Sequence, residues 1–167
     1  DDGINPYTGE AIDINAEASP FSQVDYKEVL QTSLTFYYAQ RAGDLPEDYP
    51  LDWRGDSVLD DGAEVGRDLS GGWFDAGDYV KFGFPMAATA TLLAWGGLSF
   101  EDGYAASMQE DELAGHLRFV NDYFLQAYDD KGTADISDDV FHVNVGSPYI
   151  DHQYWGSPED LDTERPV

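Results

Sequence analysis

Three stretches of this chain repeat their apolar residues with a helical period, and a long stretch without any period separates the first from the second. The segment DYKEVLQTSLTFYYAQRAG (25–43) places apolar side chains three and four residues apart, which is typical of one face of a helix. Asp25 and Glu28 have the spacing of a capping box, and Gly43 can end the helix. The sequence therefore predicts a first helix within this segment.

Two further helices are predicted in the second half of the chain. Pro85 suits a helix start, and MAATATLLAWGGL (86–98) is apolar nearly all round, so we expect that helix to be buried. Ser107 and Glu110 have capping-box spacing before the third helix. One face of that helix holds Leu113, Leu117, Val120, Phe124 and Ala127.

The rest of the chain has little regular pattern. Residues 44–84 are rich in Gly, Asp and Pro and show no period, and an unstructured stretch of this length indicates a functional loop region. VFHVNVG (140–146) alternates weakly and predicts at most a short strand, and the residues after it return to loop. We expect an extended arm or linker over 1–24 and one all-α domain over 25–167 whose long loops carry the function.

The net charge of the chain restricts the classes of molecule that it can bind. It has 34 acidic residues against 8 Lys and Arg, a net charge of −26. Nucleic acid and anionic membrane surfaces are excluded as partners, because no basic patch can neutralise phosphates. Uncharged substrates or cations fit better. There is no cysteine and no apolar run that could span a bilayer, and the chain opens without a signal peptide, as a mature secreted protein also would.

The strongest candidate site is GGWFDAGDYVKFGFP (71–85), which contains Asp75 and Asp78. In so acidic a chain such a pair can arise by chance, and Asp135 and Asp138 form another. The glycines around the first pair permit tight backbone turns, and the many rings are unusual for a solvent loop. Two carboxylates among rings suit sugar cleavage, where one removes a proton from water and its neighbour raises the proton affinity of its partner.

Three other motifs have a functional and a structural interpretation. DHQYWG (151–156) places Trp155 three residues after His152, which suits a cleft wall, although each residue alone is more often structural. Arg-Gly-Asp (54–56) matches an adhesion motif, but a structural turn beneath the active loop is favoured. DDKGTADISDD (129–139) holds five Asp and could bind calcium through oxygen ligands, although a solvated acidic turn is favoured.

The quoted motifs together resemble glycoside hydrolase family nine. FYYAQRAG, WRGDSVLDDGAEVGRDLSGGWFDAGDYVKFGFPMA, TATLLAWG and DHQYWGSPEDLDTERP occur in the order and approximate spacing of that family, from about Tyr26 to Pro166. The resemblance implies the amino-terminal part of an (α/α)6 barrel and an inverting hydrolase of cellulose or related β-1,4-glucans. It implies that Asp78 is the general base and that Asp75 helps to hold the attacking water.

The resemblance also implies a substrate-binding loop and a missing part. His152 would hydrogen-bond a sugar hydroxyl and Trp155 would stack on a sugar ring. Tyr79 stands where the family usually has His, so we expect a substrate contact of a different kind there.

The family's catalytic domain is more than twice as long, and its general-acid Glu lies in a part that this chain does not contain. The resemblance therefore implies a secreted, extracellular enzyme without a cofactor, in which the remaining carboxyl-terminal part of the same enzyme completes the site. The alternatives are a non-catalytic glucan-binding protein, which would keep the aromatic half of the cleft, and an adhesion protein that uses the Arg-Gly-Asp motif.

Overall fold

The structure, a computed structural model, describes residues 26–167. The expected arm over 1–24 and the Asp25 cap lie outside these residues. The helices are α1 (Tyr26–Ala39), α2 (Gly83–Ser99), α3 (Glu101–Ser107), α4 (Glu110–Ala127) and α5 (Pro148–Asp151), with 3-10 turns η2 (Ala63–Val65) and η3 (Pro158–Asp160). Two antiparallel pairs of two-residue strands join β1 (Lys81–Phe82) to β4 (Asn144–Val145) and β2 (Tyr128–Asp129) to β3 (Val140–Phe141).

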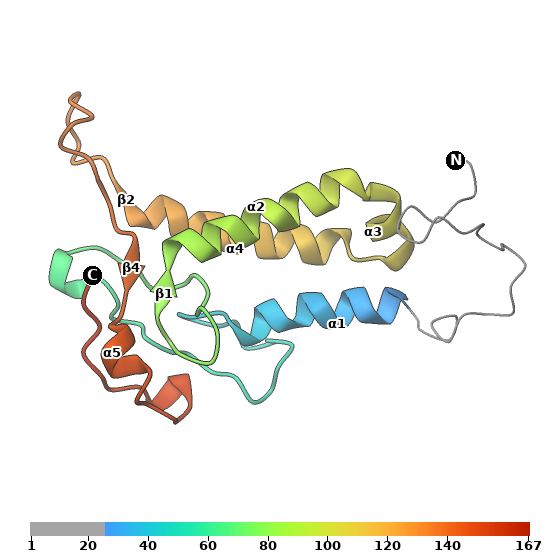
Figure 1. Ribbon diagram of the computed structural model, residues 1–167, viewed down its shortest axis with the longest axis horizontal. Helices are drawn as coiled ribbons and strands as arrows, with labels where there is room; N and C mark the ends of the chain where they lie inside the picture. The colour runs from blue at the N-terminus through green and yellow to red at the C-terminus, as the bar shows by residue number, and fades with distance from the viewer. Residues whose placement is uncertain (1–25) are drawn as a thin grey trace, which may run out of the picture.

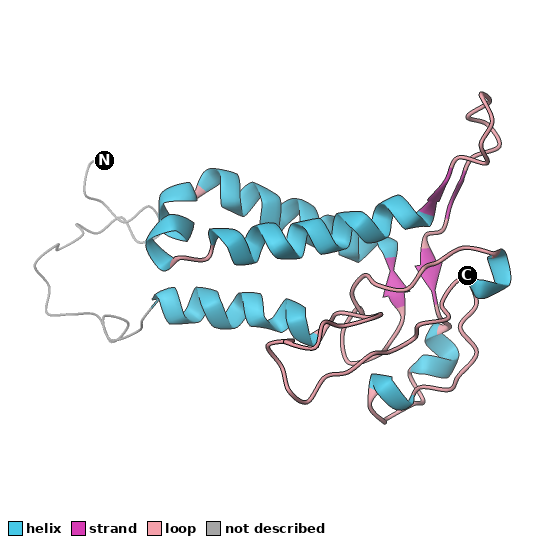
Figure 2. Cartoon of the chain, turned by 180° about the vertical axis from the view of Figure 1, so that it is seen from behind, coloured by secondary structure: helices cyan, strands magenta, loops and turns pink. Residues whose placement is uncertain are grey.

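The three long helices form the body of the described chain (Figure 1). α2 packs along α4, α3 makes the turn between them, and α1 contacts α3 and α4. The long loops, the β1–β4 pair and α5 gather at the carboxyl ends of α1 and α4, as the view from behind also shows (Figure 2). The β2–β3 hairpin projects from this end. The helices therefore hold one group of loops at one end of the body.

The core is built mainly by the apolar face of α4, as its spacing predicted. Leu113, Val120 and Ala127 are buried, and Leu117 and Phe124 pack partly buried beside them. Trp73 from the long loop and Met86 from α2 complete the same cluster. The loop that carries the candidate carboxylates is thereby anchored in the helical core.

The expectation of a buried α2 is wrong. Only Gly83, Met86 and Ala90 of this helix are buried, and four large apolar side chains are exposed: Phe84, Leu92, Trp95 and Leu98. The reason is that α2 packs on α4 with one face, while its opposite face meets no partner among residues 26–167. An apolar sequence all round the helix cannot tell which face finds a partner within the described chain.

The expected capping box of the third helix is also wrong. Ser107 is the last residue of α3, and its hydroxyl donates to the carbonyl oxygens of Gly103 and Tyr104. Met108 has a left-handed φ of 59°, which breaks the helix before α4 begins at Glu110. The spacing of Ser107 and Glu110 thus falls across a turn between two helices.

Short elements also occur where loop was expected. α5 and η3 lie within the carboxyl-terminal segment, and VFHVNVG (140–146) divides into the two strands β3 and β4, which pair with different partners. Within residues 26–167, no helix combines the length and apolar character needed to cross a membrane.

Candidate active site

Backbone hydrogen bonds fix the amino-terminal end of the loop that carries the two candidate carboxylates. Gly72 accepts a hydrogen bond from the backbone N–H of Ala42 at 3.0 Å. Its φ is 75°, and an added Cβ would lie 2.9 Å from the ring of Tyr123, so this position needs glycine for both its conformation and its packing. Two residues later, Phe74 N–H donates to the carbonyl of Gln40 at 2.8 Å. The 72–74 segment is therefore held by backbone hydrogen bonds against the residues that follow α1.

The other end of the loop is held by a strand pair. Lys81 of β1 lies opposite Val145 of β4. Asp75 N–H donates to the carbonyl of Val80 at 3.0 Å, which closes the loop on itself. Val80 N–H in turn donates to Oδ1 of Asp78 at 2.9 Å. The orientation of the Asp78 carboxylate is therefore set by the backbone of its own loop.

The structure brings His152 to Asp78, although 74 residues separate them in sequence. Nε2 of His152 lies 3.2 Å from Oδ2 of Asp78, and the side chains are 56% and 12% exposed respectively. Partial burial raises the pKa of Asp75, and the nearby charge of Asp78 raises it further, while His152 lowers it. The two expected catalytic residues and one expected substrate-binding residue thus form one cluster.

Tyr79 and Trp155, two of the expected substrate-binding residues, differ in their surroundings. The Tyr79 hydroxyl donates to the carbonyl of Gly156 at 2.6 Å, and its ring meets the rings of Phe74 and Tyr154 edge-on, with centroids 5.1 and 5.9 Å away. Tyr79 therefore ties the two predicted site loops together, a structural role that sequence reasoning did not foresee. Trp155 is 93% exposed, which leaves its ring free for stacking.

A small hollow of about 170 Å³ opens beside Asp75. Its walls come from the carboxyl end of α1 and the residue after it, from the 73–75 segment, from β1 and from the first turns of α2: Phe36, Tyr37, Gln40, Trp73, Phe74, Asp75, Phe82, Pro85, Met86 and Thr89. Asp75 is the one charged residue in this wall, which otherwise consists mainly of rings and apolar side chains. The arrangement suits an uncharged, ring-shaped ligand better than an ion.

A buried group of charges lies under the loop. Nζ of Lys81 lies 2.6 Å from Oδ2 of Asp61, and Arg165 holds the same carboxylate with a fork of 2.6 and 3.1 Å contacts. Burial lowers the pKa of Lys81 to about 8, while the charge of Asp61 opposes that shift. The sequence analysis did not identify these residues. The one indication in the sequence was the scarcity of basic residues, of which eight stand against 34 acidic ones.

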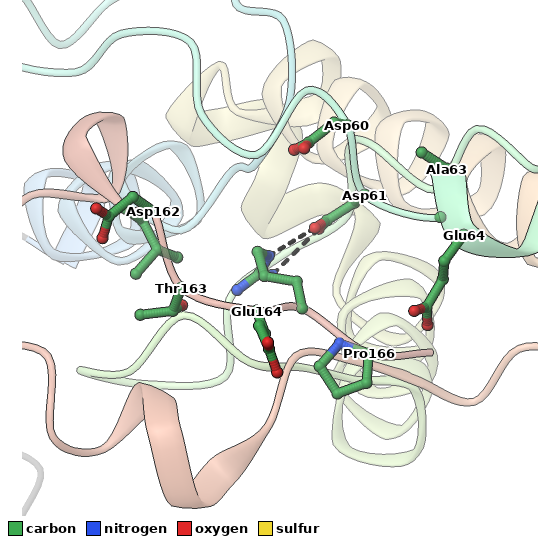
Figure 3. Close-up of a pocket in the computed structure, with 11 residues that line it drawn as sticks. Asp60, Asp61, Ala63, Glu64, Asp162, Thr163, Glu164 and Pro166 are labelled. Carbon is green, nitrogen blue, oxygen red and sulfur yellow. Dashed lines mark hydrogen bonds and ion pairs between the residues drawn. The ribbon is translucent and has the colours of Figure 1, made fainter.

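A larger hollow of about 570 Å³ lies between the 60–64 and 161–166 segments (Figure 3). Dashed lines in the figure mark the contacts of Asp61, whose partner in this wall is Arg165, and Asp60, Glu64 and Asp162 also line the hollow. Neither Asp75 nor Asp78 belongs to its wall. This acidic hollow is therefore separate from the carboxylate cluster of the 71–85 loop.

The Arg-Gly-Asp motif has a structural role, as the favoured interpretation held. Arg54 is buried, donates to the backbone carbonyls of Ala39 and Arg41, and pairs with Glu159 at 2.9 Å. The adhesion alternative is wrong, because a buried arginine cannot be presented to a partner.

The acidic 129–139 segment forms the turn of the β2–β3 hairpin. Several of its carboxylates have partners within the hairpin, where Thr133 donates to Asp138 and Tyr128 donates to Asp139. Among the residues that the structure describes, no group of three or more His, Asp or Glu is placed to hold a metal ion. Calcium binding at this turn stays a prediction.

Comparison with known proteins gives a consistent result over nearly the whole described chain. The model of the family named glycosyl hydrolase family 9 matches residues 26–167. The chain is 51% identical over 142 residues to endoglucanase B of Cellulomonas fimi, covering 85% of this chain and 13% of that protein. It is 40% identical over 167 residues to endoglucanase 10 of Arabidopsis thaliana, covering 100% of this chain and 29% of that protein.

Solved structures agree with the sequence relatives. The endoglucanase of the termite Nasutitermes takasagoensis superimposes with a TM-score of 0.75 at 45% identity, over 86% of this chain and 32% of that one. The cellulase Cel9M of C. cellulolyticum in complex with cellobiose gives a TM-score of 0.77 at 36% identity, over 86% and 32%. The expected fold class, all-α and part of an (α/α)6 barrel, is confirmed. The chain spans a third or less of the length of these relatives.

Proposed function

This chain belongs to glycosyl hydrolase family 9, and from that membership we propose that it forms the amino-terminal part of an enzyme that hydrolyses cellulose or a related β-1,4-glucan with inversion. The observation that carries the proposal is the cluster of Asp75, Asp78 and His152 beside a hollow walled by rings. The domain would then run over 25–167 as an incomplete catalytic domain, with 1–24 as an arm outside it.

In this proposal Asp78 is the general base. Each oxygen of its carboxylate accepts one hydrogen bond, from Val80 N–H and from His152, and each keeps a second lone pair. One of these lone pairs can accept the proton of a water that attacks the anomeric carbon. Asp75 helps to hold that water, and the electrostatic effect of the Asp78 charge on Asp75 indicates that the two carboxylates lie close enough to act on one water.

The general acid would come from the remaining carboxyl-terminal part of the same enzyme. An inverting glycosidase needs its acid about 6.5–9.5 Å from its base, so that a water fits between base and sugar. The exposed face of α2 supports such a partner, because Trp95 and Leu98 border an apolar hollow of about 550 Å³ between α2 and α4. The relatives are several times longer than this chain, which is consistent with a missing part that covers this face.

The proposed substrate is uncharged and polymeric. The net charge of −26 disfavours anionic polysaccharides, and the exposed ring of Trp155 suits stacking on a sugar face. His152 would hydrogen-bond a sugar hydroxyl as well as Asp78. The curated relatives are named endoglucanases, and one structural neighbour carries cellobiose. Because cellulose is an insoluble polymer that lies outside cells, we also propose that the enzyme is secreted. We propose that it needs no cofactor, because two carboxyl groups and a water are sufficient for the hydrolysis.

The test is the turnover and binding of cellopentaose by the complete enzyme and its Asp78→Asn and Asp75→Asn variants. We expect Asp78→Asn to reduce turnover by about 10²–10⁴-fold with little change in binding, since amide and carboxylate are nearly isosteric. Asp75→Asn should have a smaller but still severe effect. Near-normal turnover in Asp78→Asn would overturn the base assignment.

The isolated 167-residue chain provides the second arm of the test. We expect it to show no turnover, because in this proposal the general acid lies in the remaining carboxyl-terminal part of the enzyme. Binding without turnover in the complete protein would instead support the alternative of a non-catalytic glucan-binding protein.

A further inference from the structure

One guanidinium group, that of Arg165, contacts both loops that carry the carboxylate cluster. The side chain of Arg165 is 7% exposed, and its Nε and Nη2 hold both oxygens of Asp61 at 2.6 and 3.1 Å. Asp61 is fully buried and is itself fixed by Lys81, whose ammonium also donates to the carbonyls of Leu69 and Gly71. The contacts with Asp61 therefore immobilise the guanidinium group of Arg165. Its other N–H donors reach the loop of Asp78 and the loop of His152.

The first of these donors reaches the loop of Asp78. Nη2 of Arg165 donates to the carbonyl of Tyr79 at 2.9 Å. That carbonyl belongs to the peptide unit whose N–H is the N–H of Val80, and this N–H donates to Oδ1 of Asp78 at 2.9 Å. Because a peptide unit is planar and rigid, fixing its oxygen also fixes the direction of its N–H. Arg165 thus orients the donor to one carboxylate oxygen of Asp78.

The second donor reaches the loop of His152. Nη1 of Arg165 lies 3.4 Å from Oδ1 of Asp151, which is fully buried at the end of α5. His152 follows immediately, and its Nε2 contacts the other oxygen of Asp78 at 3.2 Å. Burial raises the pKa of Asp151, whereas the charge of Arg165 lowers it, so the guanidinium helps to keep this carboxylate ionised and attached. Arg165 thereby orients the second partner of Asp78.

We propose that Arg165 is a positioning residue for the reaction, which sets the orientation of the Asp78 carboxylate through the Tyr79–Val80 peptide and through the Asp151–His152 corner. This inference rests on the proposed function of Asp78 as base. A base that is turned or displaced by about 1 Å can lose about 10²-fold in rate, because proton transfer from the attacking water needs alignment. Arg165 acts on this alignment without touching the substrate.

The variant that tests the inference is Arg165→Lys in the complete enzyme. A lysine ammonium keeps the positive charge beside Asp61, but it cannot form the fork and reach Tyr79 and Asp151 at once. We expect kcat to fall by about 10²-fold while KM for cello-oligosaccharides changes by less than about threefold, since the sugar contacts remain.

Arg67→Lys is the matched control. Arg67 also fixes a loop through backbone carbonyls, those of Gln126 and Tyr128, and it lies near Asp129. None of these contacts involves the carboxylate cluster. We expect this variant to keep the kcat of the parent enzyme, even if its melting temperature falls.

Azide provides a readout that a merely structural role would not change. Azide attacks the anomeric carbon as the bond to the leaving oxygen breaks, the general acid protonates that oxygen, and a cellobioside substrate gives a cellobiosyl azide. Azide has no proton to lose, so this reaction does not need an aligned base. We expect azide to increase the turnover of a cellobioside substrate several-fold in Arg165→Lys and in Asp78→Ala, but not in Arg67→Lys. An Arg165→Lys enzyme that is folded and is not accelerated by azide would overturn the inference.

The two proposals fail differently in this design. Full turnover in Asp78→Ala would contradict the proposed function itself, whereas azide rescue of Asp78→Ala alone would leave that function intact and contradict the role of Arg165.

If Arg165→Lys does not fold, Asp151→Asn tests the positioning role instead. This variant leaves in place the contacts of Arg165 with Asp61 and with the carbonyl of Tyr79. We expect a decrease in its kcat of about fivefold that azide reverses. An unchanged kcat would contradict the positioning role.

Discussion

At the scale of single residues, His116 is a titratable group that the protein holds neutral inside its core. The side chain is fully buried, and its ring lies 4.4 Å from that of Tyr38 and 5.7 Å from that of Tyr37, measured between centroids. Nη2 of Arg41 lies 3.3 Å from Nδ1 of His116. Since a guanidinium can only donate, Nδ1 must accept and the ring proton must sit on Nε2. Burial and the Arg41 charge together lower the pKa of His116 to about 4.

This residue should make the protein less stable in mild acid. A folded pKa of about 4, below the ordinary value of 6.5, means that the unfolded state binds more protons between these two pH values. The stability from the neutral ring is then complete above about pH 6.5 and is lost as the pH falls toward 4. We expect a loss of about 2 kcal/mol in the free energy of unfolding over this interval.

The measurement is urea unfolding of the parent protein and of His116→Gln at about pH 7 and at about pH 4.5. The glutamine variant removes the titrating group, so the difference between the two proteins isolates His116 from the many carboxylates. Parallel pH dependences in the two proteins would contradict the prediction.

At the scale of elements, α2 shows two faces that its sequence does not distinguish. Ala90 and Met86 pack against the core, and Leu93 lies partly buried beside them. Leu98 is 85% exposed, and Trp95 and Leu92 are also exposed. All of these residues are apolar, so the local pattern predicts burial at every position of the helix. In the proposed enzyme the exposed face is covered by the remaining part of the domain.

A polar substitution on the exposed face should therefore act differently in the chain alone and in the complete enzyme. In residues 26–167 alone, we expect Leu98→Gln to leave the melting temperature unchanged and to reduce self-association. In the complete enzyme, burying an amide without partners should cost about 1–3 kcal/mol of stability and lower the melting temperature.

Leu93→Gln is the matched control. Leu93 packs against the core of the chain itself, so this substitution should destabilise both the chain alone and the complete enzyme. Thermal melting and light scattering check the prediction. Equal melting temperatures for Leu98→Gln and the parent in the complete enzyme would show that this face stays uncovered.

At the scale of the whole molecule, charge repulsion dominates the surface. The chain carries 34 acidic and 8 basic residues, and several of the basic residues are withdrawn from the surface: Arg54, Lys81 and Arg165 have side chains that are 7% exposed or less. These residues pair with buried or half-buried carboxylates, so the remaining acidic residues face one another across the surface with few counter-charges. Such repulsion lowers the stability of the compact state.

Salt should consequently stabilise the protein. We expect the melting temperature to rise between about 0.05 M and about 1 M potassium chloride, because the Debye length shortens from roughly 14 Å to about 3 Å and screens the surface repulsion. Choline chloride at equal ionic strength is the control, since screening depends on ionic strength rather than on the cation. A flat or falling melting temperature in both salts would contradict the expectation, and a rise with potassium alone would indicate specific ion binding.

Several features followed from local patterns in the sequence. The apolar spacing of α4 predicted its buried face from Leu113 to Ala127, because residues three and four apart lie on the same side of any helix. The glycines and rings around Asp75 and Asp78 marked that loop, and the structure does place both carboxylates in one cluster. The same local reasoning failed at Ser107, where a left-handed Met108 interrupts the chain between two helices.

Residue types at short spacing were sufficient to predict the main helices, the loop that carries the carboxylates and the family. Which distant groups meet could be seen only in the folded chain. His152 joins Asp78 across 74 positions, and Arg165 joins Asp61 across 104. In a chain with 34 acidic residues, no spacing indicates which carboxylate an arginine will bind. That choice follows from the path of the folded backbone, and from the cost of burying any charge without a partner.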